Sequence, residues 1–161
     1  MLRLRTDTDP VLRRQCEPLK KVGSRERDLF IEMTAMMRRY NGIGLAAPQV
    51  GIPQQLVVME IGEDIVALAN PRVSKPQGRR TMKEGCLSLP GLTVRVPRAR
   101  EITVTGLDTQ NNPITLTLKG LAARVVQHEV DHLKGILISD YRHRSVVSFL
   151  RGALVGRTER C

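Results

Sequence analysis

The sequence predicts an α+β fold in which antiparallel or mixed sheets surround a central helix, with further helices near the N- and C-terminal ends. Helices are indicated where residues 28–40 and 126–133 repeat apolar side chains at helical spacing. Strands are indicated where residues 102–106 and 114–118 alternate apolar and polar side chains. A chain of 161 residues with 41% apolar side chains can close one core and is small for two. We therefore expect residues 1–161 to form a single compact domain.

The first helix is expected over Asp28–Tyr40. Apolar side chains recur there at helical spacing, and several are methionines, which favours a core stripe over a cofactor surface. Ser24 precedes the stripe as a possible cap, and Asn41 and Gly42 follow it as a stop. A last amphipathic helix is expected over Val146–Val155.

Four short segments between these helices carry strand patterns: Gln55–Glu60, Ile65–Leu68, Ile102–Gly106 and Ile114–Leu118. Asn70 and Pro71 are expected to close the second of them. The polar residues 108–113 are rich in turn formers, so we expect the last two strands to pair as a hairpin.

The central helix contains the most informative motif, because His128 and His132 stand four residues apart within 127–133. Residues four apart lie on one helix face, so both rings can bind one divalent ion. Glu129 then lies within reach of a water on that ion. Gly135 follows where a helix end is expected. This H-E-x-x-H pattern indicates hydrolysis of an amide, although two histidines on a helix can also be ordinary core or surface residues.

A catalytic metal site normally has three protein ligands. The metzincin pattern H-E-x-x-H-x-x-G-x-x-H matches through Gly135, but Ile138 stands where its last histidine should be, which excludes that family. Thermolysin-like proteases take their third ligand from a glutamate further downstream; Glu159 is the only glutamate after the motif here, and its place next to the C-terminus makes it a poor candidate. Cys86 is a better candidate, because a thiolate binds zinc or ferrous iron well. A lone cysteine can otherwise be an inert buried residue.

A third segment, residues 42–49 (G-I-G-L-A-A-P-Q), allows close backbone approach and ends in an amide that can donate to an oxyanion. With E-G-C-L-S at 84–88 and Q-H-E-V-D-H at 127–132, the chain closely resembles the peptide deformylase family. These hydrolases remove the formyl group from the N-terminal formyl-methionine of new bacterial polypeptides. The three motifs occur in order, and the resemblance extends over most of the chain.

The resemblance implies three metal ligands: Cys86, His128 and His132. It implies that Glu129 is the general base and acid, and that Gln49 and the backbone N–H of Leu87 are oxyanion donors. It also implies one divalent ion, Fe(II) in the native enzyme, with Zn, Ni or Co as replacements. Ligand types alone suit zinc and ferrous iron alike. From the residues themselves, Asp131 or Glu84 could hold a ring N–H of a ligand histidine.

A substrate pocket can be proposed on the same helix. Leu121 and Val125 precede the first motif histidine by seven and three residues, so they share its face and could form an apolar wall. Ile43 would be the opposite wall, and Gly44 and Gly85 would leave room for an extended peptide backbone. Such a slot suits methionine, which agrees with the preference of the family. The leucine and the valine could equally be plain core residues.

The net charge of +10 and a pI near 10.4 raise the question of an anionic partner. Basic residues are scattered along the chain, and only two tyrosines, two phenylalanines and no tryptophan are present. This argues against a single-strand or sequence-specific nucleic-acid binder. One interpretation is that the basic surface contacts the ribosome, chiefly through residues 148–160. The other is that the charged surface is simply solvated.

No apolar run of signal-peptide or membrane-span length occurs, so we expect a cytoplasmic protein without membrane contact. The three cysteines are odd in number and widely separated, which does not indicate a disulfide framework, and Cys16 and Cys161 are interpreted as incidental. Two rival classes stay open. One is a zinc endopeptidase using the same helix, and the other is a metal-stabilised RNA-binding module.

Overall fold

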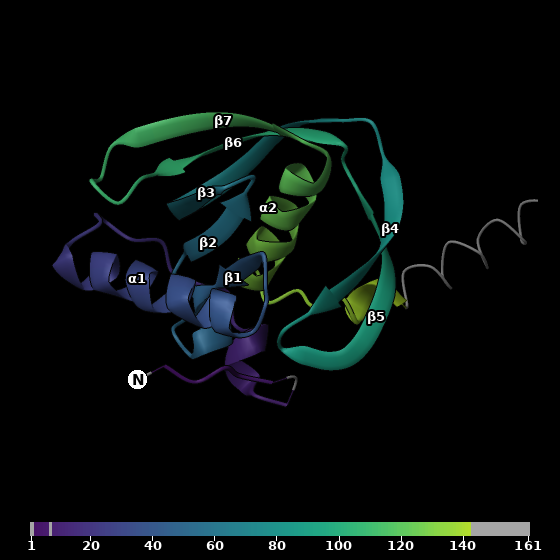
Figure 1. Ribbon diagram of the computed structural model, residues 1–161, viewed down its shortest axis with the longest axis horizontal. Coiled ribbons are helices and arrows are strands. Elements are labelled where there is room, and N and C mark those ends of the chain that lie inside the picture. Colours follow the sequence, from purple (N-terminus) through teal and green to yellow (C-terminus); the bar gives the residue numbers. More distant parts are fainter. Residues whose placement is uncertain (1, 7, 143–161) are drawn as a thin grey trace, which may run out of the picture.

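The computed structural model describes residues 2–6 and 8–142, and it confirms the α+β class (Figure 1). The larger sheet is antiparallel and five-stranded, in the spatial order β1, β2, β3, β6, β7. The bounds of its strands are β1 Gly44–Ala46, β2 Leu56–Ile61, β3 Asp64–Gln77, β6 Glu101–Leu107 and β7 Pro113–Lys119. A separate antiparallel pair consists of β4 (Arg80–Cys86) and β5 (Leu89–Arg98).

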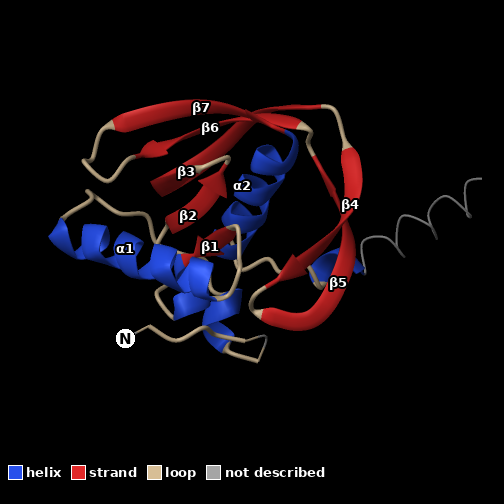
Figure 2. Cartoon of the chain, viewed as in Figure 1, coloured by secondary structure: helices blue, strands red, loops and turns tan. Residues whose placement is uncertain are grey.

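Helix α2 (Gly120–Leu133) lies between the two sheets, as the ribbon in Figure 2 shows, and α1 (Ser24–Arg39) covers the larger sheet. Short 3₁₀ helices, η1 (Pro10–Arg13) and η2 (Ala47–Val50), complete the described elements. None of the helices in this described part is long and apolar enough to span a membrane. The helix expected over Val146–Val155 and the basic stretch 148–160 lie outside the described residues.

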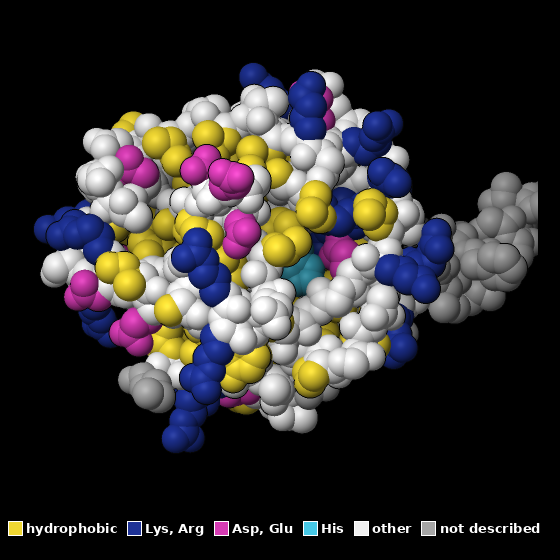
Figure 3. Space-filling view, in the orientation of Figure 1, with side chains coloured by type: hydrophobic (Ala, Val, Ile, Leu, Met, Phe, Trp, Pro, Cys, Tyr) yellow, Lys and Arg dark blue, Asp and Glu magenta, His cyan; other side chains and the backbone are white. Residues whose placement is uncertain are grey.

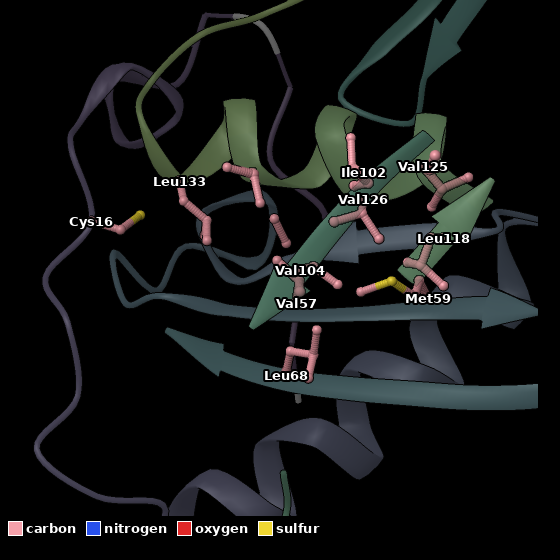
Figure 4. Close-up of a cluster of buried hydrophobic side chains, with 13 residues drawn as sticks. Cys16, Val57, Met59, Leu68, Ile102, Val104, Leu118, Val125, Val126 and Leu133 are labelled. Carbon is pink, nitrogen blue, oxygen red and sulfur yellow. The ribbon is translucent and has the colours of Figure 1, made fainter. Parts of the chain in front are cut away.

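Strand β2 is buried on both faces, because alternate residues of a strand point to opposite faces and a helix packs on each side of it. Val57 and Met59 on β2 face α2, whereas Leu56 and Val58 face α1. We call the α2 side the sheet cluster, and Figure 4 shows its side chains interleaving. Its members are Cys16, Ala46, Val57, Met59, Leu68, Ile102, Val104, Leu118, Ala123, Val125, Val126, Val130 and Leu133. The methionine stripe of α1 is buried on the other face, as expected for a core stripe.

A third apolar group, the hairpin cluster, lies under β4 and β5. Its buried members are Leu12, Leu89, Val94, Val96, Leu137 and Ile138. They come from η1, from β5 and from the chain that follows α2. Among the described residues, no side chain of α2 itself belongs to this cluster, so α2 and the β4–β5 pair are packed into different apolar groups.

The predicted bounds of the first helix need correction at one end. Helix α1 begins at Ser24 rather than at Asp28, and Ser24 is its first residue rather than its cap. The reason is Glu26, whose Oε2 accepts the backbone N–H of Gly23 at 2.8 Å and stabilises an earlier first turn. The predicted stop is confirmed, because Asn41 has a φ of 53° directly after the helix.

The prediction that Asn70 and Pro71 end a strand is wrong, because β3 continues to Gln77. Asn70 has a φ of 51°, and the pairing with β6 shifts register between Ala69 and Arg72. The asparagine and the proline therefore form a bulge within a longer strand, a position that tolerates proline. The hairpin of β6 and β7 is confirmed, with Ile102 opposite Leu118.

The sequence did not predict β4 and β5. Gly85, Pro90 and Gly91 interrupt any alternating pattern there, and β4 carries mostly exposed polar side chains. The two strands are defined instead by their pairing with each other, which runs from Arg80 opposite Arg98 to Cys86 opposite Leu89.

Candidate metal centre

Three donor side chains meet where the end of β4 approaches α2. Cys86 is the last residue of β4, and His128 and His132 occupy successive turns of α2. Cys86 Sγ lies 3.3 Å from His132 Nε2, which lies 3.2 Å from His128 Nε2. Tetrahedral coordination at ordinary zinc bond lengths separates such donors by about 3.3–3.6 Å. One donor atom from each residue lies within 4.8 Å of the others, so the set fits a single divalent ion.

The end of α2 is fixed by local sequence. Gly135 has a φ of 70°, and its N–H donates to the carbonyl of His132, while the N–H of Ile136 donates to that of Asp131. This is the glycine-dependent Schellman ending, so both motif histidines stay within the last two helical turns. His132 is 1% exposed, and His128 opens toward solvent on one side.

Glu84 orients the first histidine. Its Oε2 lies 3.0 Å from His128 Nδ1, which directs Nε2 of that ring toward Cys86 and His132. The prediction is thus confirmed for Glu84 and wrong for Asp131, whose carboxylate accepts from Arg98 and Tyr141 instead. Asp131 is drawn to the β5 side because Arg98 is buried there. Nδ1 of His132 has no hydrogen-bond partner among the described residues.

The charges around the three donors shift their proton affinities. Burial would raise the pKa of Glu84, but hydrogen bonds from His128 and Arg98 outweigh it and lower the pKa to about 2. Burial opposes charge on His128, yet its hydrogen bonds with Cys86 and Glu84 raise the pKa of this ring to about 10. Burial lowers the pKa of His132. A metal ion bound here would therefore replace a proton that His128 otherwise holds.

Glu129 lies beside the donors with one oxygen unsatisfied. The residue is 4% exposed, and its Oε2 has no hydrogen-bond partner within the described part of the chain. Burial raises its pKa to about 7, against the opposing charges of His128 and Arg98. A Cβ on Gly44 would collide with Glu129 Oε1 and would stand 2.8 Å from Val125 Cγ1. Only glycine leaves room for this carboxylate, and a carboxylate with that pKa can exchange protons near neutrality.

The amide of Gln49 is held in one orientation. Its Oε1 accepts the backbone N–H of Ala46 at 2.8 Å, so its Nε2 points the other way. Nε2 lies 3.2 Å from Ser88 Oγ and 3.7 Å from Cys86 Sγ. Gln49 is 2% exposed in η2, which positions a donor directly beside the three metal-binding candidates.

A cavity of about 530 Å³ opens over these groups. Every predicted site residue except the buried His132 lines this cavity. These residues are Ile43, Gly44, Gln49, Gly85, Cys86, Leu87, Leu121, Val125, His128 and Glu129. Figure 3 shows histidine surface in a hollow with apolar side chains beside it. Val125 is buried, whereas Leu121 is 61% and Ile43 45% exposed, so these two lie at the mouth rather than in the depth.

Two buried arginines near the donors were not predicted. Arg98 and Arg124 both donate to Glu84. Arg124 carries a signal that could have been used, because it precedes His128 by one helical turn on the same face. Arg98 carries none, since its partners lie on β4 and α2 and are brought together only by the fold.

A cysteine, a histidine, an unsatisfied glutamate and a fixed amide line one cavity, and a second histidine lies buried behind them at ligand spacing. The fold and this site define the class as a metal-dependent hydrolase with an H-E-x-x-H helix. The family model described as polypeptide deformylase matches residues 1–147, and the chain belongs to this family.

Individual relatives agree with this assignment. A peptide deformylase of Alkaliphilus metalliredigens is 43% identical over 137 residues, which cover 85% of this chain and 93% of the relative. The crystal structure of peptide deformylase from Thermotoga maritima superposes with a TM-score of 0.84 at 41% identity, covering 87% of this chain and 96% of that one. A Met-Ala-Ser-bound class I type b peptide deformylase from Acinetobacter baumannii gives 0.80 at 30% identity, covering 86% and 96%.

The protein is accordingly an enzyme, a metal-dependent hydrolase that removes the N-formyl group from nascent peptides. The comparisons favour neither of the rival classes, the zinc endopeptidase and the RNA-binding module.

Proposed function

We propose that Cys86, His128 and His132 hold the catalytic ion, which is Fe(II) in the native enzyme and can be replaced by Zn, Ni or Co. The observation that carries this proposal is the spacing of one thiol and two imidazoles within 4.8 Å. Such a donor set suits both zinc and ferrous iron. The preference for iron rests on the family resemblance.

When bound, the ion acidifies a water molecule and polarises the formyl carbonyl. We assign Glu129 to take the proton of the attacking water and to return it to the amine nitrogen as the C–N bond breaks. Its raised pKa of about 7 suits both steps. The Gln49 side chain and the backbone N–H of Leu87 donate to the oxygen that gains negative charge. The products are formate and a peptide with a free amino terminus.

Substrate selection is assigned to the cavity. Ile43, Leu121 and Val125 present apolar surface for the methionine side chain. An extended peptide backbone is assigned to pair with Gly44 and Gly85, and Gly85 leaves it space, because a Cβ there would meet no atom closer than 3.9 Å. A deformylase relative has been solved with Met-Ala-Ser bound, which supports a methionine-first peptide as the ligand here. A formyl carbon carries only hydrogen, so we expect a site crowded by Gly44, Leu87 and the metal to admit it and to exclude an acetyl methyl group.

The proposal is tested with iron- or nickel-loaded protein and three peptides: formyl-Met-Ala-Ser, acetyl-Met-Ala-Ser and a longer unformylated peptide. We expect formate release from the first alone, measured with a coupled formate assay. Replacing methionine by alanine should lower kcat/KM, since each lost methylene-sized contact is worth about 1–3 kcal/mol. Internal cleavage of the unformylated peptide would support the endopeptidase instead. Tight RNA binding without any hydrolysis would support the RNA-binding module.

Three broader assignments belong to the same proposal. Residues 1–161 form one catalytic domain, which the family match over residues 1–147 supports. The enzyme acts in the cytoplasm, where nascent chains are made. A contact with the ribosome through the basic surface is supported by the net charge of +10, and ribosome co-sedimentation at increasing salt would test it.

A further inference from the structure

The three metal-binding candidates come from two parts of the fold that share no apolar cluster. His128 and His132 belong to α2, which packs into the sheet cluster. Cys86 ends β4 and packs against the hairpin cluster, to which no described α2 side chain contributes. Apolar packing alone therefore does not fix where Cys86 stands relative to the two histidines.

The two parts are bridged by charged groups, which we call the polar junction: the buried Glu84, Arg98 and Arg124 and the half-buried Asp131. Arg98 on β5 binds Glu84 with two donors at 2.9 Å and reaches Asp131 on α2 at 2.6 Å. Arg124 makes the reverse connection, because it belongs to α2 and donates to Glu84 on β4. Within this junction two cations face two carboxylates, so the charges of these four side chains balance one another.

Arg124 shares Glu84 with Arg98 and in addition contacts the backbone of both strands. Its Nη1 donates to Glu84 Oε1 at 2.5 Å and to the carbonyl of Val96 at 3.0 Å. Its Nη2 donates to the carbonyl of Arg80 at 2.6 Å. One guanidinium thus ties α2 to the backbone of both β4 and β5, and to the carboxylate that orients His128. The side chain is 8% exposed, so these bonds are shielded from water.

We propose that Arg124 is a positioning residue that sets the place of Cys86 relative to His128 and His132. It acts through Glu84 on the orientation of His128, and through the two carbonyls on the strand pair that carries Cys86. The planar guanidinium is required, since a lysine ammonium can reach Glu84 but cannot serve acceptors on both strands in one fixed geometry. This inference rests on the proposed ligand set and adds a residue that acts through Glu84 and the strand backbone rather than as a metal ligand.

The test compares wild-type protein with Arg124→Met and Arg124→Lys after loading with cobalt. Metal affinity is measured by competition with a chromophoric chelator, and the geometry is read from the thiolate-to-cobalt absorption band. We expect metal binding about 10–100-fold weaker in Arg124→Met, the usual effect of losing a group that supports a ligand. A weaker or displaced band should accompany it. Arg124→Lys should lie between wild type and Arg124→Met in both measurements.

Controls separate positioning from stability and from the ligand set. Arg79→Met removes an exposed charge next to β4 and should leave affinity and band unchanged. The positioning role is overturned if both Arg124 variants lower thermal stability but keep the metal affinity and the thiolate-to-cobalt band of wild type. If Arg124→Met does not fold, the same two measurements on Arg124→Lys decide. Cys86→Ala should abolish the band. A band that survives in Cys86→Ala would overturn the ligand set, and the positioning role with it, whatever the Arg124 variants do.

Discussion

The two sides of α2 are held by different kinds of interaction. Toward the five-stranded sheet, its Val126, Val130 and Leu133 enter an apolar cluster, where attraction depends on buried area and hardly on direction. Toward the β4–β5 pair, its Arg124 and Asp131 enter the polar junction, where hydrogen bonds require defined distances and angles. The first side anchors the helix, and the second sets the direction of the groups that carry chemistry. Variants on the two sides should therefore fail in different ways.

The largest effect is expected on the chemical side. Glu129→Ala should lower kcat by roughly 10²–10⁴-fold, the range for losing a positioned proton-transfer group, while metal content stays near wild type. His132→Ala should lose both metal and activity. Metal analysis of each purified variant alongside steady-state kinetics makes the comparison. Near-full activity in Glu129→Ala would show that another group transfers the proton.

Gln49→Ala tests a second group that we assign to catalysis, the side-chain amide beside the metal-binding candidates. Loss of an oxyanion donor should lower kcat by roughly 10²–10³-fold, with a smaller change in KM, because the donor acts on charge that develops in the transition state. The matched control is Gln55→Ala, whose amide donates to the carbonyl of Cys16 on the apolar side of the fold. That control should keep wild-type kcat. Equal losses of kcat in both variants would argue against an oxyanion role for Gln49.

Leu68→Ala tests the anchoring side. Leu68 is fully buried in the sheet cluster, so the substitution should lower the free energy of unfolding by about 2–5 kcal/mol through lost contacts and a cavity. At a temperature where the variant is folded, kcat and metal affinity should match wild type. Urea titration and steady-state kinetics give the two numbers. If kcat fell tenfold while the fold persisted, the separation between anchoring and chemistry would not hold.

The smallest effect concerns Cys16, a buried thiol of the sheet cluster. Burial raises its pKa from 9.0 to about 11, so the native state keeps a proton that the unfolded chain releases. Between pH 9 and about 11 the unfolded state binds fewer protons, and stability falls as pH rises. The contribution lost by pH 10 is roughly 1 kcal/mol. Urea unfolding at pH 8 and pH 10 should show this extra loss in wild type and not in Cys16→Ala; equal pH dependence in both proteins would contradict it.

Much of the site could be predicted from local patterns. His128, Glu129 and His132 are fixed by a contiguous motif on a helix whose end at Gly135 is also local. The glycines before Gln49 signal a close approach, which Gly44 makes against Glu129. Cys86 could be proposed as a third ligand from its thiol chemistry, and the resemblance to peptide deformylases singled it out and added Leu87; the connection of neither residue to the helix is visible in spacing alone.

The sequence by itself determined the α+β class, the hairpin of β6 and β7, and the family, because helical and strand periodicity and contiguous motifs are properties of neighbouring residues. Tertiary structure alone decided the β4–β5 pair and the continuation of β3 past Asn70, since pairing with a distant strand outweighs local interruptions. It also decided that Glu84 rather than Asp131 holds His128, and that Arg98 and Arg124 meet on that carboxylate. Those partners are separated by 14 to 44 residues, and only packing brings them together.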